Sequence, residues 1–167
     1  VHGWYAIVDD VTERNRNRRE LEAALALQAT ERLRLESILA GTNAGTWEWN
    51  MQTREARFNE RWAEMLGHDY DELRPTHVRA WADHVHPDDL ALARERLRRH
   101  IKGELPFYEC EVRMRHAQGH WIWVLDRGRL QTRTADGEPE WMYGTAQDIS
   151  ASKAIEQSLR EATRAAE

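Results

Sequence analysis

The sequence predicts an α+β fold built on an antiparallel sheet. Two short β-patterned segments come early in the chain, several helical segments follow, and three longer β-patterned segments near the end are separated by turn residues. The clearest strand pattern covers residues 108–115, where apolar side chains from Tyr108 to Met114 alternate with charged ones. Because strands joined by short turns pair antiparallel, this order of elements predicts the α+β class.

A long helix is predicted before the first strand, over residues 14–41. Leucine, isoleucine and alanine side chains recur on one stripe between Leu21 and Leu39, and neither proline nor glycine interrupts the pattern before Gly41. We interpret this segment as a helical linker.

The predicted sheet begins with a hairpin. Apolar and polar residues alternate from Thr46 to Asn50, and a polar turn then leads to a second short strand at Phe58. Asn59 is suited to cap the helix that follows. That helix is expected to end at Gly67, because glycine readily adopts the left-handed conformation common at helix ends.

Three more helices are predicted between the early and the late strands. Two are short, at residues 70–73 and 78–84. The third begins at His86-Pro87-Asp88-Asp89, where proline suits the first helical position and the carboxylates lie at the positive end of the helix dipole. It is expected to run through Ile101 to Gly103.

The last three strands are predicted at residues 108–115, 121–130 and 141–149. Turns at Gln118-Gly119 and Asp136-Gly137 separate them.

A final helix is predicted over residues 151–167. Ile155, Leu159, Ala162 and Ala166 are spaced four, three and four residues apart, as in the seam of a coiled coil. The same spacing also fits a surface helix that packs on its own domain, and both interpretations stay open.

Two segments of the chain repeat one another at a constant offset of 138 residues. Residues 4–12 align with residues 142–150. In both copies a β-patterned run ends in an aspartate, an aliphatic residue and a hydroxyl residue, and a charged helical stretch follows. These ends are Asp10-Val11-Thr12 and Asp148-Ile149-Ser150.

The composition is typical of a soluble globular protein. Apolar residues make up 41% of the chain and charged residues 32%. No apolar run approaches the roughly 20 residues that span a bilayer, and the N-terminus has no signal-peptide pattern. The net charge of -5 spreads over 24 basic and 29 acidic residues without a basic block, so nucleic acid is not an expected partner. A single cysteine, Cys110, excludes an internal disulfide and is compatible with the cytoplasm.

Five segments resemble, in order, the landmarks of the PAS superfamily, in the subgroup whose helix begins with His-Pro-Asp-Asp. They are Gly45-Thr46-Trp47-Glu48-Trp49, Trp62-Ala63-Glu64-Met65-Leu66-Gly67, His86-Pro87-Asp88-Asp89, Gly119-His120-Trp121-Ile122-Trp123-Val124 and Gly144-Thr145-Ala146-Gln147-Asp148-Ile149-Ser150. The resemblance implies a PAS fold, a five-stranded antiparallel sheet with helices over one face, flanked by N- and C-terminal linker helices.

The resemblance and the internal repeat together predict the domain boundaries. Residues 1–13 are expected to be the C-terminal strand of a preceding PAS domain, and residues 14–41 its helical linker. Residues 42–150 are the expected PAS domain, and residues 151–167 the start of a signalling helix toward an output domain.

The predicted signal-transmission junctions are Asp148-Ile149-Ser150 and its first copy, Asp10-Val11-Thr12. An aspartate and a hydroxyl at a strand end can cap the next helix, so that strand and helix move together. In the PAS family the matching Asp-aliphatic-Thr element couples the sensor to its output helix. Ser150 keeps the hydroxyl of that threonine without its methyl group, and Asp10-Val11-Thr12 fits the family form more closely. Capping alone would explain the same residues, and that alternative stays open.

The candidate pocket-lining residues are large aromatic side chains and the cysteine. They are Trp47, Trp49, Trp81, Cys110, Trp121 and Trp123. Together they could enclose a small-ligand pocket of the kind that sensory PAS domains use, or they could simply fill the core.

No catalytic residue, metal site or cofactor is predicted. The eight histidines offer no convincing set of three or four metal ligands. His84, His86 and His100 are the candidates for a haem ligand, but His86 is better explained as part of a helix start. The flavin-binding relatives have a reactive cysteine in a helical Asn-Cys-Arg motif that this sequence lacks. Neither haem nor flavin is therefore expected, and an unidentified small ligand stays open.

The resemblance implies a sensory module of a multi-PAS, bacterial-type signalling protein, which is not itself an enzyme. A ligand or stimulus is expected to bias the sheet, and paired linker helices to pass the change to an output domain. Residues 158–167 resemble the helix before the phosphoacceptor domain of sensor histidine kinases, which favours a two-component system. The alternatives are a diguanylate cyclase output or a ligand-free structural dimerisation module.

The expected partners are a second copy of the chain, forming a homodimer through the linker helices, and the neighbouring PAS and output domains. The expected location is the cytoplasm, without nucleic acid or membrane contact.

Overall fold

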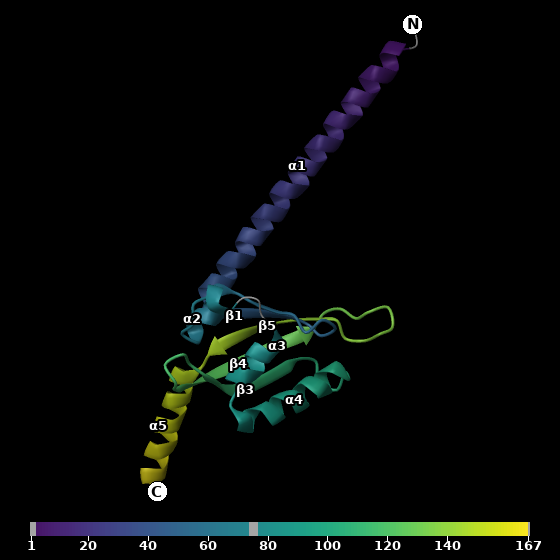
Figure 1. The fold of residues 1–167 in the computed structure, drawn as a ribbon. Coiled ribbons are helices and arrows are strands. Elements are labelled where there is room, and N and C mark those ends of the chain that lie inside the picture. The colour runs from purple at the N-terminus through teal and green to yellow at the C-terminus, as the bar shows by residue number, and fades with distance from the viewer. Residues whose placement is uncertain (1–2, 74–76, 167) are drawn as a thin grey trace. The chain divides into compact units, whose positions relative to one another are not determined.

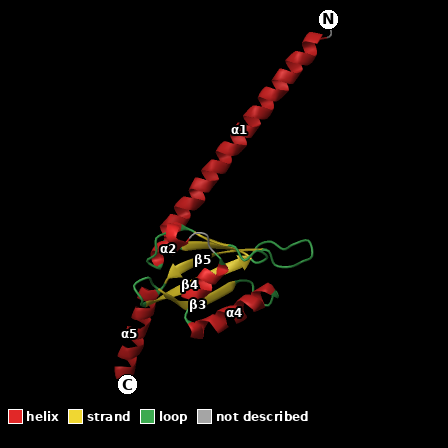
Figure 2. Ribbon diagram, viewed as in Figure 1, coloured by secondary structure: helices red, strands yellow, loops and turns green. Residues whose placement is uncertain are grey.

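The structure is a computed structural model that describes residues 3–73 and 77–166, with the backbone alone described for residues 3–10. The chain divides into two units between Thr42 and Asn43. One unit is a single long helix, and the other contains a sheet with its covering helices (Figures 1 and 2). The elements are α1 (Gly3–Thr42), β1 (Gly45–Asn50), β2 (Ala56–Phe58), α2 (Glu60–Met65), the 3₁₀ turn η1 (Asp71–Leu73), α3 (Val78–His84), α4 (Pro87–Ile101), β3 (Tyr108–Arg115), β4 (Trp121–Leu130), β5 (Trp141–Asp148) and α5 (Ser150–Ala166).

The described strands form one antiparallel five-stranded sheet in the order β2-β1-β5-β4-β3. β1 pairs with β2, β3 with β4 and β4 with β5, as expected for strands joined by short turns. β1 also pairs with β5, so the first and the last strand of the sheet lie side by side. The predicted α+β class and the predicted five-stranded sheet are confirmed.

One face of the sheet packs against α2, α3 and α4, and the core lies between these two layers. Figure 1 shows α3 and α4 beside the sheet, in teal. The ring of Phe58 stacks on that of Trp62 with 3.9 Å between centroids, which fixes α2 against the first hairpin. The largest fully buried side chains are Trp62, Leu66, Met114, Met142, Val112 and Val124.

The helix ends agree with the sequence predictions. Asn59 Oδ1 accepts a hydrogen bond from the backbone N–H of Trp62 at 3.0 Å and so caps α2. Gly67 follows that helix with a φ of 73°, in the left-handed region. Pro87 is the first residue of α4, and the ring of His86 caps this helix by accepting from the N–H of Asp88 at 3.1 Å.

The segment at the N-terminus differs from its prediction. The helix predicted over residues 14–41 is present, but α1 begins already at Gly3, where a strand was predicted. A strand needs a neighbour to satisfy its backbone hydrogen bonds, whereas a helix satisfies them within itself. No strand of the described sheet pairs with this segment, and it is helical. Residues 1 and 2 lie outside the described residues.

The C-terminal helix α5 follows β5 directly. From Ser150 to Ala166 it has no buried residue, and Ile155 and Leu159 are 63% and 64% exposed. The stripe noticed in the sequence is thus an exposed apolar stripe, and its coiled-coil pairing stays a prediction. Among the described helices, none combines the length and the apolar character that crossing a membrane requires.

Candidate functional site

The candidate site is built around Asp126, a carboxylate in the core. It lies on β4, and its neighbours on the inward face of that strand are Val124 and Gly128. Because successive residues of a strand point to opposite faces, this alternation places the Asp126 side chain under the helices. The residue is 2% exposed. Charged groups are rarely buried so completely without dedicated partners.

Two indole N–H groups hold the carboxylate. Trp47 Nε1, from β1, donates to Asp126 Oδ1 at 2.7 Å, and Trp81 Nε1, from α3, donates to Oδ2 at 3.0 Å. Hydrogen bonds to an ionised acceptor are stronger than those between neutral groups. Asp126 therefore joins two strands and a covering helix at one point.

Two glycines make room for the indole of Trp47. Gly144 on β5 lies directly opposite Trp47, and Gly128 on β4 lies opposite Gly144. A Cβ atom at either glycine would clash with the Trp47 ring. The missing side chains let this ring lie across β5 and reach Asp126 on the next strand.

A cavity of about 50 Å³ adjoins the Asp126 carboxylate. A buried water needs roughly 10–15 Å³ of such space, so the cavity has room for several waters or a small organic molecule. Its walls come from β1, β2, β3, β4, β5, α3 and α4. The lining residues are Trp47, Glu48, Trp49, Ala56, Phe58, Val78, Trp81, Arg94, Leu97, Tyr108, Asp126 and Met142.

Burial dominates the electrostatics of this site. It raises the pKa of Asp126 to about 7, although the hydrogen bonds from Trp47 and Trp81 and the nearby Tyr108 hydroxyl act in the opposite direction. No cationic side chain of the described residues forms an ion pair with this carboxylate or lowers its pKa. Burial likewise raises the pKa of the Tyr108 hydroxyl, and the nearby Asp126 charge adds to this shift.

Two polar atoms on the cavity-lining residues lack a partner. Within the described part of the chain, neither Tyr108 Oη nor Trp49 Nε1 makes a hydrogen bond of good geometry, although both atoms are buried. Asp126 acts on the Tyr108 hydroxyl electrostatically, but the geometry falls short of a hydrogen bond. Such groups in native proteins are usually satisfied by water or by a ligand.

The predicted pocket residues divide between the two faces of the sheet. Trp47, Trp49 and Trp81 line the cavity. Trp121 and Trp123 belong to the opposite face of β4, where Trp121 is 40% exposed, so their assignment to a pocket is corrected. Their odd-numbered positions alternate with the inward Ile122 and Val124, and alternation along a strand decides the face.

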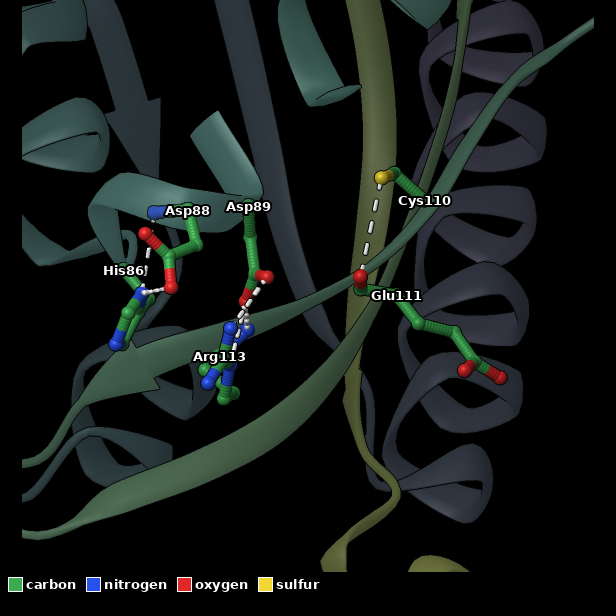
Figure 3. A network of polar contacts seen from close by, with 6 residues as sticks. All are labelled: His86, Asp88, Asp89, Cys110, Glu111 and Arg113. Atoms are coloured by element: carbon green, nitrogen blue, oxygen red, sulfur yellow. Dashed lines mark hydrogen bonds and ion pairs between the residues drawn. The ribbon is translucent and has the colours of Figure 1, made fainter. Parts of the chain in front are cut away.

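Cys110 is buried on β3 but is not among the cavity-lining residues. Its Sγ lies 3.8 Å from the carbonyl oxygen of Glu111 (Figure 3). Burial raises the pKa of the thiol to about 11, so at neutral pH it is protonated and unreactive.

The sequence interpretation missed Asp126 and Tyr108. The sequence contains a signal for Asp126, which shares the even-numbered face of its strand with the apolar Ile122 and Val124. An aspartate on the apolar face of a strand indicates a buried polar site.

The junction Asp148-Ile149-Ser150 lies between β5 and α5 in the chain, and its hydrogen bonds attach the start of α5 to β4. Asp148 Oδ1 accepts from the N–H of Ser150 at 2.9 Å, which caps the start of the helix. Ser150 Oγ accepts from the N–H of Trp123 at 2.9 Å, and the N–H of Ile149 donates to the carbonyl of Trp123 at 2.8 Å. Both backbone groups of one β4 residue are thus bound by the junction.

Lys153, in the first turn of α5, adds a side-chain connection to the outer face of the sheet. Its ammonium group forms an ion pair with Glu111 on β3 and lies 5.2 Å from the centre of the Trp123 ring. The first turn of α5 is therefore attached to both β3 and β4.

The first copy of the motif lies in a different setting. Asp10, Val11 and Thr12 are inside α1, so they do not lie at a strand end. The side chain of Asp10 is outside the described part of the structure. The strand-to-helix junction that was predicted for this copy is therefore not present among the described residues.

A second polar cluster joins the start of α4 to β3. Asp89 accepts from Arg113 at three points, with 2.8 Å to the backbone N, 2.9 Å to Nε and 2.8 Å to Nη2 (Figure 3). Arg113 holds the pKa of the Asp89 carboxyl below its ordinary value. The neighbouring Asp88 points toward His86 and is mostly exposed.

The histidines considered as haem ligands each have a local partner. His84 Nδ1 donates to the carbonyl of Ala80 at 2.6 Å, and His84 Nε2 lies 3.1 Å from His68 Nε2. His100 bonds to Leu105 and Leu130 through its two ring nitrogens. Within residues 3–73 and 77–166, histidine, cysteine and carboxylate side chains nowhere gather in a group of three or more that could hold a metal ion.

Comparison with known proteins agrees with the geometry. A family model described as the PAS fold matches residues 55–146. No curated protein sequence matches this chain.

Several solved structures share the architecture. A sensory box histidine kinase/response regulator from Burkholderia thailandensis is 27% identical, with a TM-score of 0.69 over 78% of this chain and 95% of the other. The N-terminal domain of a diguanylate cyclase with PAS/PAC sensor from Marinobacter aquaeolei is 25% identical, with a TM-score of 0.56 over 66% of this chain and 98% of the other. A PAS domain from Colwellia psychrerythraea, at 14% identity, shows the fold alone, with a TM-score of 0.55 over 71% of this chain and 98% of the other.

The five-stranded antiparallel sheet with helices over one face is thus the fold that the sequence resemblance implied. Since the family model spans more than half of the chain, this protein belongs to the PAS family of sensory domains.

Proposed function

We propose that the sheet domain senses a small ligand in the Asp126 cavity and passes a conformational change through α5 to an output domain of the same protein. The observation that supports this most directly is that β4 contains both ends of the path. Asp126 lines the cavity, and Trp123, three residues earlier on the strand, binds the start of α5.

The proposed path from the cavity to α5 follows a short stretch of the β4 backbone. At about 3.3 Å per residue, Trp123 and Asp126 lie roughly 10 Å apart along β4. A ligand that alters the bonds from Trp47 or Trp81 to Asp126 changes how β4 is held, and Trp123 transmits that change to Ser150 and Ile149. The ligand must bind the two arrangements with different affinity for any shift to occur.

A histidine kinase is the proposed output, and a diguanylate cyclase is the alternative. The similarity of the chain to a sensory box histidine kinase/response regulator supports the first, and its similarity to a diguanylate cyclase with a PAS/PAC sensor supports the second. An activity assay of a longer protein that includes this chain would distinguish the two outputs. Phosphate transfer from ATP to a histidine is expected for a histidine kinase, and conversion of GTP to cyclic diguanylate for a diguanylate cyclase.

We further propose that the chain forms a homodimer in the cytoplasm through its helices. The support is the exposed apolar stripe of α5, at Ile155 and Leu159, whose burial against a second copy would be favourable. Light scattering of the purified chain tests this, with an Ile155→Glu, Leu159→Glu double variant expected to be monomeric. A wild-type monomer would contradict the dimer.

The sensing path is tested by hydrogen exchange of the purified chain. The Trp81→Phe variant keeps an aromatic ring but removes one N–H donor to Asp126. If the cavity and α5 are coupled, the amide protons of Ile149 and Lys153, which bond to Trp123 and Ile149, exchange faster in this variant. The Trp121→Phe variant, whose ring lies on the outer face, is the control.

Changes confined to the surroundings of Trp81 would contradict transmission. A ligand-free structural module then becomes the better account of the domain. Native mass spectrometry of the purified chain supports sensing if it shows a retained small molecule in stoichiometric amount.

A further inference from the structure

The cavity contains a buried carboxyl group that has no cationic partner among the described residues. The Asp126 carboxylate is bound by the two neutral indole donors of Trp47 and Trp81, and no cation of the described residues pairs with it. Each oxygen has accepted one hydrogen bond from these donors and retains a further lone pair. Ionisation of such a buried carboxyl group is costly until a positive group joins it.

The walls around this carboxylate are aromatic. Trp47, Trp49, Phe58, Trp81 and Tyr108 all line the cavity. The ring of Tyr108 lies edge-on to that of Trp47, with 6.5 Å between centroids. The faces of indole, phenol and phenyl rings carry negative potential and attract cations, most strongly where water is excluded.

The two unpaired polar atoms of the cavity indicate which functional groups a ligand would need. Trp49 Nε1 is a donor only, and Tyr108 Oη can donate or accept. A ligand that satisfied both would combine a positive group with a hydrogen-bond acceptor. With about 50 Å³ available, it would have only a few heavy atoms.

We infer that the cavity binds a small organic ammonium ion, with its nitrogen against Asp126 and the indole faces of Trp47 and Trp81. This inference rests on the proposed sensory function of the cavity and gives its ligand a chemical class. An ammonium group donates to the free lone pairs of the carboxylate and supplies the missing positive charge.

Two other charged residues line the cavity and bear on the sign of the ligand. Glu48 lies 3.8 Å from Arg57, so its charge is already partly compensated. Arg94 is on the exposed side of α4. Arg94 favours an anionic ligand and Asp126 a cationic one. We expect Asp126 to dominate, because a buried charge is screened less than an exposed one.

Titration of the purified full chain with ethanolammonium tests this, read by tryptophan fluorescence and calorimetry. The neutral control is propan-1-ol, in which a methyl group replaces the ammonium group of the probe, and the anionic control is acetate. We expect saturable binding of ethanolammonium, at least about tenfold tighter than that of either control.

Three variants make the test specific. Asp126→Asn should weaken ammonium binding by about tenfold or more, because the charge is lost while the shape is kept. Asp83→Asn, which removes an exposed carboxylate on α3, should leave it unchanged. Arg94→Gln should tighten ammonium binding, because it removes a like charge from the cavity wall, and this exposed position keeps the test valid even if Asp126→Asn does not fold.

Other outcomes would overturn the inference. Equal binding of ethanolammonium and propan-1-ol would show a merely apolar cavity, and acetate binding that Arg94→Gln abolishes would show an anion site. Absence of all binding, with ordered water in a crystal structure of the cavity, would show a hydrated core.

The failures of the two proposals can be distinguished. If ethanolammonium does not bind while Trp81→Phe still alters exchange in α5, the ligand class is wrong and transmission stands. If an ammonium probe binds without any change in α5, the ligand class stands and the sensory function is wrong.

Discussion

Trp47 on β1 donates a hydrogen bond of 2.7 Å to Asp126 on β4, although these two strands are not neighbours in the sheet. β5 lies between them, and the indole crosses it where Gly144 and Gly128 leave the space open. The bond therefore holds three adjacent strands in one arrangement at the wall of the cavity.

Gly144→Ala is expected to disrupt this crossing. The new methyl group would meet the Trp47 ring and the carbonyl of Arg127, so the indole must leave its position over β5. We expect a loss of about 3 kcal/mol in the free energy of unfolding, measured by urea denaturation, and a changed near-ultraviolet circular dichroism spectrum.

Gly41→Ala is the matched control for this change. Gly41 lies in α1, and nothing is within 4 Å of the position that its Cβ would take. Its effect should be small and in the stabilising direction, because alanine is the better helix former. A Gly144→Ala variant as stable as wild type would show that Trp47 has another place to pack.

Asp126 should make stability depend on pH in an unusual direction. Burial raises its pKa from the ordinary 3.8 to about 7, so the folded state binds the proton more tightly than the unfolded state. The contribution of Asp126 to stability is therefore fully present below about pH 4, is lost as pH rises toward 7 and is constant above that.

The measurement is the difference in unfolding free energy between wild type and Asp126→Asn across this range. This difference should change by up to about 1.4 kcal/mol per pH unit, because wild type becomes less stable relative to Asp126→Asn as pH rises. Asp83→Asn should show no such trend. Parallel curves for wild type and Asp126→Asn would mean that the carboxylate is ionised throughout.

Ser150→Ala is expected to loosen the attachment of α5 to β4. The backbone N–H of Trp123 loses its acceptor, which should cost about 1 kcal/mol and speed exchange of that amide. Ser150→Thr keeps the hydroxyl and should retain protection. Ser152→Ala, at an exposed position of the same helix, should change neither quantity. If the backbone amide of Trp123 exchanges at the same rate in Ser150→Ala as in wild type, the Ser150 hydroxyl does not couple the strand to the helix.

Asp89→Asn should destabilise the docking of α4 on β3. It removes the charge that Arg113 contacts through its backbone and its guanidinium, and we expect a loss of about 2 kcal/mol by urea denaturation. The mostly exposed Asp88 supplies the control, since Asp88→Asn should cost less than about 1 kcal/mol.

The pH dependence of this pair has the opposite sign to that of Asp126. Because Arg113 lowers the pKa of Asp89, its stabilisation is present above the ordinary value of 3.8 and is lost as pH falls through the lower folded value. The advantage of wild type over Asp89→Asn should therefore shrink in acid. An advantage that persists at about pH 2 would show that the carboxylate charge is not its source.

Local pattern was sufficient for most of the fold. The alternation in β3, the cap at Asn59 and the proline at the start of α4 depend on neighbouring residues only, so the sequence by itself determined these elements and their order. The series of landmarks across residues 42–150 determined the family.

The tertiary structure decided what local pattern leaves open. Whether Gly3–Thr42 begins as a strand or a helix depends on a neighbouring strand, and the described sheet contains none for it. Trp81 and Trp123 were equivalent as candidates, and only the packing of α3 and the face of β4 separate them. The site itself joins residues that are far apart in the sequence. Asp126 lies 79 positions after Trp47 and 45 positions after Trp81. Contacts over such separations arise from the closing of the sheet and the docking of its helices, which no short segment of sequence encodes.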